Sequence, residues 1–327
     1  MRRNLRIERL LDESEHERRC AVGLTDADRR ALTRRVAAGE LLSPYRNLYA
    51  RRAYWVAMTV MQRTVHVARS LAMLHPEWIF AGLTAATIHG YDHSYSLHDG
   101  TVTIASPRTS QARDSGKLRR IRMTDPQVLV VDGLRVTDPV RTLLDCGSAF
   151  PFEEMLAIFD AAARRGIGMD AVTAACGQGA GVDAARIARL CEHADGRSEN
   201  GGESKVRALM IGNGFLKPQL QRRFENPDNP LGPYRSDFSW ELPNGIVVAE
   251  YDGMAKYTMP QSGVGERAGE RVGERRLVQT AVHAERRRED HLRAQGVTAI
   301  ARLEFEDTLY PGRLIRKLLD AGVPRVV

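Results

Sequence analysis

The pattern of apolar and polar positions in the N-terminal part of the chain predicts helices followed by a short β-hairpin. Thr25 stands before a helical run and Asp28 follows three residues later, which is the spacing of a capping box. Gly39 comes where a helix commonly ends in a left-handed residue. The next stretch, LLSPYRNLYARR, alternates loosely between apolar and polar residues. Helices followed by such a hairpin predict a winged helix-turn-helix over residues 1–55.

Residues 56–196 mix helical and strand-like periodicity, which predicts a middle α/β unit. The run AYWVAMTVMQRTVHVARSLAMLHP predicts one long helix that ends before Pro76, and GTVTIAS, RRIRM and VLVVDGLRVT predict strands. Asp132 and Gly133 form a two-residue hairpin signal between two β-rich runs. Asp138 is placed to cap a helix whose first residue is Pro139.

A polar, glycine-rich stretch, ADGRSENGG, predicts the boundary of a third unit over residues 197–327. The pattern beyond it predicts a helix, three strands, a long helix, a strand and a last helix, at residues 203–211, 218–224, 234–240, 246–252, 274–295, 297–303 and 311–321. We therefore expect a mixed, multidomain α/β protein.

The charge of the chain favours a polyanionic partner, and DNA is the first candidate. The formal net charge is +7 at pH 7, and residues 1–52 hold 13 arginines against 8 acids. The expected DNA contacts lie on the second helix and the wing, at Arg29, Arg30, Arg34, Arg35 and Arg46. The alternative is a solvated helix face, because Asp26 and Asp28 offset part of this charge.

Composition also argues against several classes of protein. The 4 cysteines form no C-x-x-C pair, so neither a zinc site nor a disulfide framework is expected. The N-terminus lacks the apolar segment of a signal peptide, and no apolar run is long enough to span a bilayer. We therefore expect a cytoplasmic protein with no membrane partner. The sequence does not indicate an oligomeric state.

Acidic residues at the end of an apolar strand, VVAEYDGMAKY, suggest a catalytic site. The preceding Pro243-Asn244-Gly245 is a tight-turn signature. If Asn244 and Gly245 form a two-residue loop, Asp237 lies opposite Asp252; if Pro243 and Asn244 form it, Asp237 lies opposite Glu250. Either way these three acids share one face, because side chains alternate along a strand. Glu203, at the start of the preceding helix, can point to the same place.

Several carboxylates on one face require a counter-charge, and oxygen ligands suit Mg²⁺ or Mn²⁺. Such an ion can polarise a phosphodiester and lower the pKa of an attacking water. In this interpretation Asp237 and Glu250 ligate the metal, Glu203 and Asp252 support them, and Lys256 stabilises charge or orients the water. Arg287 and Arg288 would contact phosphate or brace the acids. The alternative is an ordinary strand end, with Glu250 and Asp252 in solvent and paired with Arg235 and Lys256.

These motifs carry a resemblance to known families. GESKVRALMIGNGF, YRSDFSW, VVAEYDGMAKY and AERRREDHLRAQG resemble very short patch repair endonucleases, which belong to the P-D-(D/E)-x-K nuclease superfamily. The N-terminal part, including VDGLRVTDPVRTLLD, resembles AbiEi-type antitoxins of type IV toxin–antitoxin systems. The resemblance implies a restriction-endonuclease-like domain with a mixed central sheet, and it maps the family acids to Glu203, Asp237, Glu250 and Asp252. One departure is that Asp252 stands where the superfamily usually has lysine.

Two functions follow as hypotheses. In the first, the third unit is a Mg²⁺-dependent DNA endonuclease that the winged helix delivers to DNA. In the second, the protein is an antitoxin-like transcriptional regulator with an inactive nuclease-fold domain, and a cognate toxin would be its protein partner. Substitution of Asp237 and Glu250 distinguishes them, because a repressor has no need of these acids.

Overall fold

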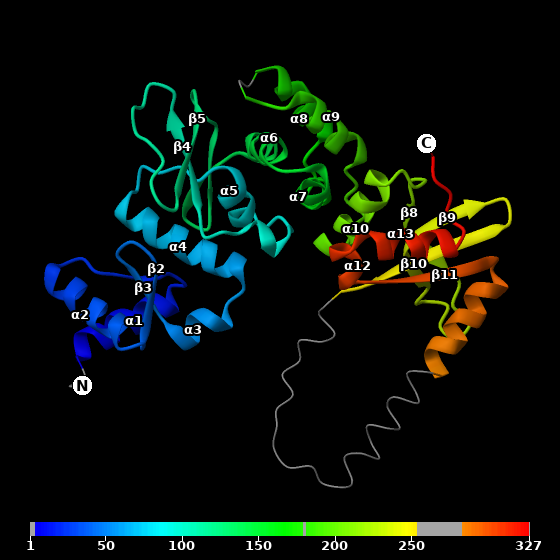
Figure 1. Cartoon of the computed structure of the whole chain (residues 1–327), viewed down its shortest axis with the longest axis horizontal. Helices are drawn as coiled ribbons and strands as arrows, with labels where there is room; N and C mark the ends of the chain where they lie inside the picture. The colour runs from blue at the N-terminus through cyan, green and yellow to red at the C-terminus, as the bar shows by residue number, and fades with distance from the viewer. Residues whose placement is uncertain (1–3, 179–180, 254–282, 327) are drawn as a thin grey trace, which may run out of the picture. The chain divides into compact units, whose positions relative to one another are not determined.

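The computed structural model describes residues 4–178, 181–253 and 283–326, and the chain divides into two compact units, residues 1–194 and 195–327 (Figure 1). Helices alternate with several small sheets, so the expected mixed α/β, multidomain class is confirmed. In the ranges that the structure describes, no helix is both long enough and apolar enough to cross a membrane.

The first unit begins with the expected helices and hairpin. Its elements are α1 (Leu5–His16), β1 (Ala21–Val22), α2 (Asp26–Ala37), β2 (Leu41–Tyr45) and β3 (Leu48–Arg51), and the strands form one sheet in the order β1-β3-β2. Thr25 and Asp28 form the expected capping box at the start of α2. Gly39, with φ of +77°, follows the helix in the left-handed region that glycine adopts at low cost.

The prediction of a single helix after the hairpin is wrong, because the chain forms two helices there. They are α3 (Arg52–Ala57) and α4 (Val60–Leu74), and Met58 between them has extended backbone angles. Thr59 caps α4 and forms a capping box with Gln62, which satisfies two backbone N–H groups at the start of the helix. This local signal, T-x-x-Q, outweighs the continuous apolar periodicity.

The remainder of the first unit contains the expected strands and the helix expected after Asp138, and it also has helices over residues 169–193 that were not predicted. It contains α5 (Gly82–Ile88), β4 (Val102–Pro107), β5 (Leu118–Met123), β6 (Val128–Val131), β7 (Leu134–Thr137), α6 (Pro139–Ala149), α7 (Phe152–Arg164), α8 (Met169–Ala175) and α9 (Ala184–His193). Asp132 and Gly133 both have positive φ between β6 and β7, as the hairpin signal predicts. Asp138 caps α6 with Pro139 at its first position.

One hydrophobic cluster joins the first 55 residues to the middle part, and a second cluster lies within those 55 residues alone. Cys20, Val22 and Leu48 pack in the same buried cluster as Val67 and Phe80. A boundary between residues 55 and 56 would divide this cluster. The described chain therefore forms two compact units where three domains were expected, and the division falls between residues 194 and 195.

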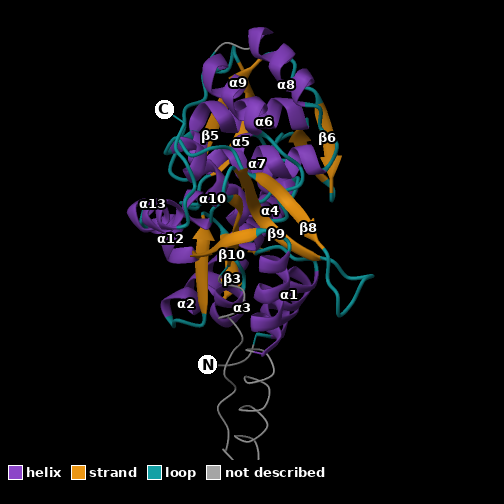
Figure 2. Ribbon diagram, turned by 90° about the vertical axis from the view of Figure 1, so that its right-hand side faces the viewer, coloured by secondary structure: helices purple, strands orange, loops and turns teal. Residues whose placement is uncertain are grey.

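The second unit is a four-stranded mixed sheet with helices on both faces (strands orange in Figure 2). Its elements are α10 (Gly201–Gly212), β8 (Gln219–Phe224), β9 (Tyr234–Leu242), β10 (Gly245–Asp252), a helix at residues 283–294, β11 (Val297–Glu304), α12 (Phe305–Leu309) and α13 (Pro311–Asp320). The order is β11-β10-β9-β8, and β10 and β11 are parallel. Val206 of α10 and Leu314 of α13 cover one face, and Leu292 covers the other.

The shared core predicts that the first unit unfolds cooperatively. Leu48→Ala removes a fully buried side chain from the cluster that joins the wing to α4, so we expect a loss of about 2–5 kcal/mol in the unfolding free energy. Chemical denaturation of the full chain, monitored by hydrogen exchange in β3 and α4, should show one transition for residues 1–194. Leu129→Ala, at a side chain 44% exposed, is the control. Separate loss of protection in β3, with α4 unchanged, would contradict a shared cluster.

Candidate active site

The hairpin between β9 and β10 brings two of the expected acids together. Gly245 pairs with Leu242, so Pro243 and Asn244 form the two-residue loop, and the pairing runs without a bulge to Ala249 and Phe238. The next position in this register sets Glu250 opposite Asp237. The Tyr251 N–H donates to Asp237 Oδ2 over 2.8 Å, which holds the carboxylate at the strand end. Of the two registers left open by the sequence, the structure has the one that pairs Asp237 with Glu250.

The start of α10 brings Glu203 close to this strand end. Asn200 caps the helix, accepting from the N–H groups of Gly202 and Glu203. A side chain at Gly202 would meet the Tyr251 ring at 2.3 Å, so glycine permits the close approach of α10 to β10. The buried Glu203 carboxylate accepts from the Glu199 N–H at 2.8 Å and from Asn200 Nδ2 at 2.6 Å. Glu203 thus both completes the helix cap and borders the site.

Gln221 is a site residue that the sequence reasoning missed. It lies in β8 at the register position opposite Asp237, and its φ of +54° is unusual for a residue other than glycine. Its Nε2 donates to Glu203 Oε2 over 3.3 Å, and its side chain also interacts with Asp237, where it offsets a small part of the rise in pKa that burial causes. Nothing in the sequence fixes the β8–β9 register, because nine residues, 225–233, separate the two strands.

The carboxylates at this site carry more negative charge than their surroundings compensate. Burial, together with the charges of Asp237 and Glu199, raises the pKa of Glu203 to about 7, and hydrogen bonds from the Glu199 N–H and Gln221 offset part of the rise. Burial also raises the pKa of Asp237, with added contributions from Glu250 and Glu199. Each carboxylate therefore makes ionisation of its neighbour less favourable, which is the situation that a bound cation relieves.

Arg288 supplies the one strong counter-charge that the described contacts place on Glu250. Its Nη1 donates to Glu250 Oε2 over 2.9 Å, and its Nη2 donates to Glu250 Oε1 and to the Arg235 carbonyl. Its guanidinium also lies over the Tyr234 ring. Arg288 thus braces the acids, which is one of the two roles expected for it. Arg287 is exposed and pairs with Asp228 at 3.4 Å, away from Glu250.

The oxygen ligands at the end of β9 and β10 determine whether a metal ion can bind at this site. Within residues 4–178, 181–253 and 283–326, no three His, Cys, Asp or Glu side chains are grouped to hold a metal ion. Asp237 and Glu250 remain as an oxygen pair, and Mg²⁺ commonly uses one or two carboxylates and completes its shell with water and phosphate. The pair fits that mode of binding in ligand type, and an ion on Glu250 would share its oxygens with Arg288. Asp252, half-buried, ends β10 and pairs with Glu304 of β11, and Lys256 lies outside the described residues.

The expected DNA contacts on α2 divide into two groups. Arg35 is buried and pairs with Glu8, so its expected contact with phosphate is wrong. Arg29 pairs with Asp26 and donates to the Gly23 carbonyl, which commits much of its guanidinium to the start of the helix. The other three, Arg30, Arg34 and Arg46, are exposed and form no ion pair with a described residue.

A further basic segment went unnoticed in the sequence. Residues 108–122 contain six Lys or Arg and one acid, Asp114. On β5 and the loop before it, Arg120 donates to the Arg113 carbonyl and Arg122 donates to the Ala112 carbonyl at 3.0 Å. Bonds to carbonyls order these guanidiniums without neutralising them. A count of charges in short windows would have found this segment.

The raised pKa of Glu203 predicts a pH-dependent stability. A carboxyl whose folded pKa lies near 7, against about 4.3 in an unfolded chain, stabilises the fold fully below pH 4.3 and loses that contribution as the pH rises through 7. Glu203→Gln removes the titration, at the constant cost of about 1 kcal/mol for the lost bond from Asn200. The difference in unfolding free energy between the variant and wild type should therefore shift in favour of the variant by up to about 3 kcal/mol as the pH rises from 4.5 to 8.

Urea denaturation across this pH range measures the difference. Glu241→Gln, at an exposed acid on the same sheet, is the control for the removal of one carboxylate. A difference for Glu203→Gln that does not change with pH would show that the pKa of the folded Glu203 carboxyl is not raised.

Comparisons with known proteins do not assign a family. No family model matches the chain. Two curated relatives, the uncharacterized proteins MT2308 and Rv2248 of Mycobacterium tuberculosis (strains CDC 1551 / Oshkosh and ATCC 25618 / H37Rv), are each 28% identical over 182 residues. The match covers 54% of this chain and 63% of each relative. Among solved structures, the RV2827C protein of Mycobacterium tuberculosis aligns with a TM-score of 0.28 at 16% identity, covering 55% of this chain and 62% of that one.

Proposed function

We propose that residues 195–327 form a Mg²⁺-dependent DNA endonuclease domain and that residues 1–194 bind DNA. The observation that carries the proposal is the meeting of Asp237, Glu250 and Glu203 at one strand end, where the pKa of Glu203 and of Asp237 is raised. A purely structural acid cluster would be expected to hold its counter-charges within the protein. Here Arg288 compensates Glu250, and Asp237 keeps capacity for a cation.

The residues of the site have distinct tasks in this proposal. Asp237 and Glu250 would hold the ion, which when bound polarises the phosphodiester and lowers the pKa of a water. The Tyr251 N–H fixes the rotamer of Asp237, and Gln221 joins Asp237 to Glu203. Glu203, with its pKa near 7, can hold or release a proton at neutral pH, as a general acid or base requires. Lys256, as expected from the sequence, would stabilise developing charge.

Delivery to DNA would fall to the first unit. The exposed cations Arg30, Arg34 and Arg46 and the arginines of the basic segment 108–122 support backbone contacts, because each neutralised phosphate releases counterions. A DNA-directed function also places the protein in the cytoplasm.

A second function is supported by a different observation. Arg288 binds both oxygens of Glu250, and Glu203 accepts from the Glu199 N–H and from the capping residue Asn200, so both acids also have structural partners. This arrangement suits an antitoxin-like regulator whose nuclease-fold unit is inactive and whose partner is a toxin protein. The two functions differ in whether Asp237 is needed for anything beyond folding.

The nuclease proposal predicts metal-dependent nicking that requires Asp237. Asp237→Asn keeps an acceptor for the Tyr251 N–H and removes one negative charge, so the fold should persist while nicking of supercoiled plasmid falls by about 100-fold or more. Glu241→Gln, on the same strand and paired with Arg222 at 2.6 Å, should retain wild-type nicking. DNA binding, measured by gel shift, should be equal in all three proteins.

The outcome separates the two functions. Nicking by wild type in Mg²⁺, absent with chelator and lost only in Asp237→Asn, supports the endonuclease. DNA binding by all three proteins with no nicking in Mg²⁺ or Mn²⁺, on supercoiled, linear or single-stranded DNA, would exclude it and leave the regulator.

A further inference from the structure

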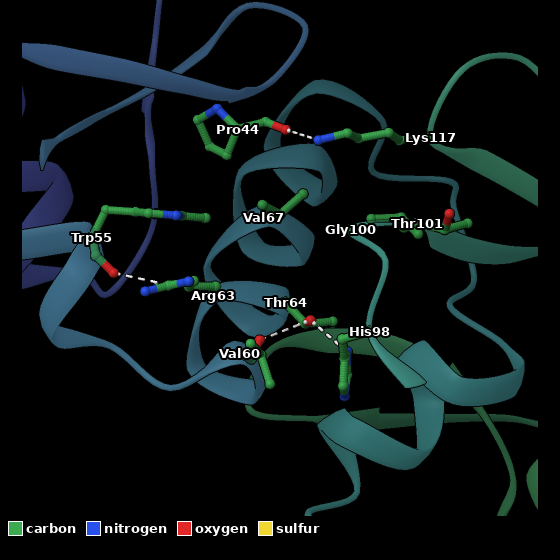
Figure 3. A pocket seen from close by; sticks show the side chains of 11 residues that line it. Pro44, Trp55, Val60, Arg63, Thr64, Val67, His98, Gly100, Thr101 and Lys117 are labelled. Carbon is green, nitrogen blue, oxygen red and sulfur yellow. Dashed lines mark hydrogen bonds between the residues drawn. The ribbon is translucent and has the colours of Figure 1, made fainter. Parts of the chain in front are cut away.

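A pocket of about 220 Å³ lies within the first unit, where the wing meets the middle part (Figure 3). Its walls come from the wing strand β2, helices α3 and α4, the loop before β4 with the first residue of that strand, and the loop before β5. The residues that line the pocket include Pro44, Trp55, Arg63, His98 and Lys117. None of these residues belongs to the candidate active site.

The pocket carries positive charge and no acidic wall. Arg63 donates from Nε to the Trp55 carbonyl at 2.9 Å and from Nη2 to the Val56 carbonyl at 3.1 Å, which leaves Nη1 for other partners. Lys117 Nζ donates to the Pro44 carbonyl at 3.1 Å. Both cations are anchored by neutral carbonyls, and no residue lining the pocket is Asp or Glu. Asp99, next in the chain to His98, does not line the pocket, and its carboxylate accepts a hydrogen bond from the Thr101 N–H at 2.8 Å.

Neutral and apolar groups form the remainder of the wall. Trp55, Val60, Val67 and Val102 supply hydrophobic surface. His98 bonds through Nδ1 to Thr64 Oγ1 at 3.0 Å and through Nε2 to His93 at 2.8 Å, and burial lowers its pKa to about 4. His98 therefore contributes an uncharged side chain to the pocket lining at neutral pH. The occupant that this lining fits has one negative group and an apolar body.

We propose that this pocket binds a small aromatic carboxylate and that the bound ligand alters the wing. The volume is below the roughly 300–1,000 Å³ typical of drug-sized ligands, which suits a single ring bearing one carboxylate. A backbone phosphate of DNA is charged but lacks the apolar body that Trp55 and the three valines match. A carboxylate at Lys117 competes with the Pro44 carbonyl, so binding loosens the bond that ties β2 to the loop before β5.

The test of binding uses benzoate with the full-length protein. Benzoate should raise the midpoint of thermal unfolding with a saturable dose dependence, whereas benzamide, of the same shape without charge, and inorganic phosphate, without the ring, should not. Lys117→Gln should weaken the affinity for benzoate by about tenfold, because one charge-assisted hydrogen bond is lost. Lys217→Gln, at an exposed lysine of the second unit, is the matched control and should bind as wild type. Equal binding of benzoate and benzamide, no saturable binding of benzoate, or no effect of Lys117→Gln would overturn the proposal.

The effect on the wing rests on the proposed DNA binding and is measured separately. Addition of benzoate should change the affinity of the wild-type protein for duplex DNA. The same addition should have no effect on the DNA affinity of Lys117→Gln. If benzoate binds but DNA affinity is constant, the coupling is refuted and the pocket stands; if the protein binds no DNA, the proposed function fails independently of the pocket. The logarithm of the DNA-binding constant can also be plotted against the logarithm of the salt concentration, without benzoate. If the slope for Lys117→Gln is smaller than that of wild type by about one, Lys117 contacts a phosphate, and the small-ligand assignment is overturned.

Discussion

The repulsion among carboxylates at the end of β9 and β10 is the constraint on which the second unit depends. Burial raises the pKa of both Glu203 and Asp237, the charge of Asp237 adds to the rise at Glu203, and the charge of Glu250 adds to the rise at Asp237. The fold accommodates this charge with groups that are otherwise unnecessary. Arg288 reaches from the helix at residues 283–294, Gln221 takes an unusual backbone conformation, and Gly202 allows α10 to approach Tyr251. Such local cost is typical of functional sites rather than of supporting structure.

The first unit depends on a different constraint, which is the continuity of its core. A winged helix that packs on its neighbour through Leu48, Val67 and Phe80 cannot move as an independent module without exposing that cluster. Any signal between the middle part and the wing must therefore pass through small shifts at their shared surface. The bond from Lys117 to the Pro44 carbonyl is one contact at that surface that can break without opening the core.

Local signals in the sequence predicted much of this structure correctly. The Thr25–Asp28 capping box, the Asp132–Gly133 hairpin and the capped Pro139 helix all follow from residues within four positions of each other. The two-residue loop after β9 even narrowed the pairing of Asp237 to two registers. Two of the failures needed information beyond such windows. The burial of Arg35 depends on Glu8 of another helix, and the place of Gln221 depends on a nine-residue loop with no fixed register. The T-x-x-Q capping box at Thr59 was local and was overlooked.

The pair formed by Arg288 and Glu250 connects the two proposed functions in physical terms. A cation that used Glu250 would have to share it with a guanidinium already bound to both oxygens, so occupancy would depend on how readily Arg288 can turn toward another anion. A DNA phosphate is such an anion, and arginine forms two-pronged bonds with phosphate as well as with carboxylate. Binding of DNA would then release Glu250 to the ion at the moment when the substrate is in place. Without DNA, the Arg288 bond would keep Glu250 compensated, and the same residues would form a stable, inactive unit.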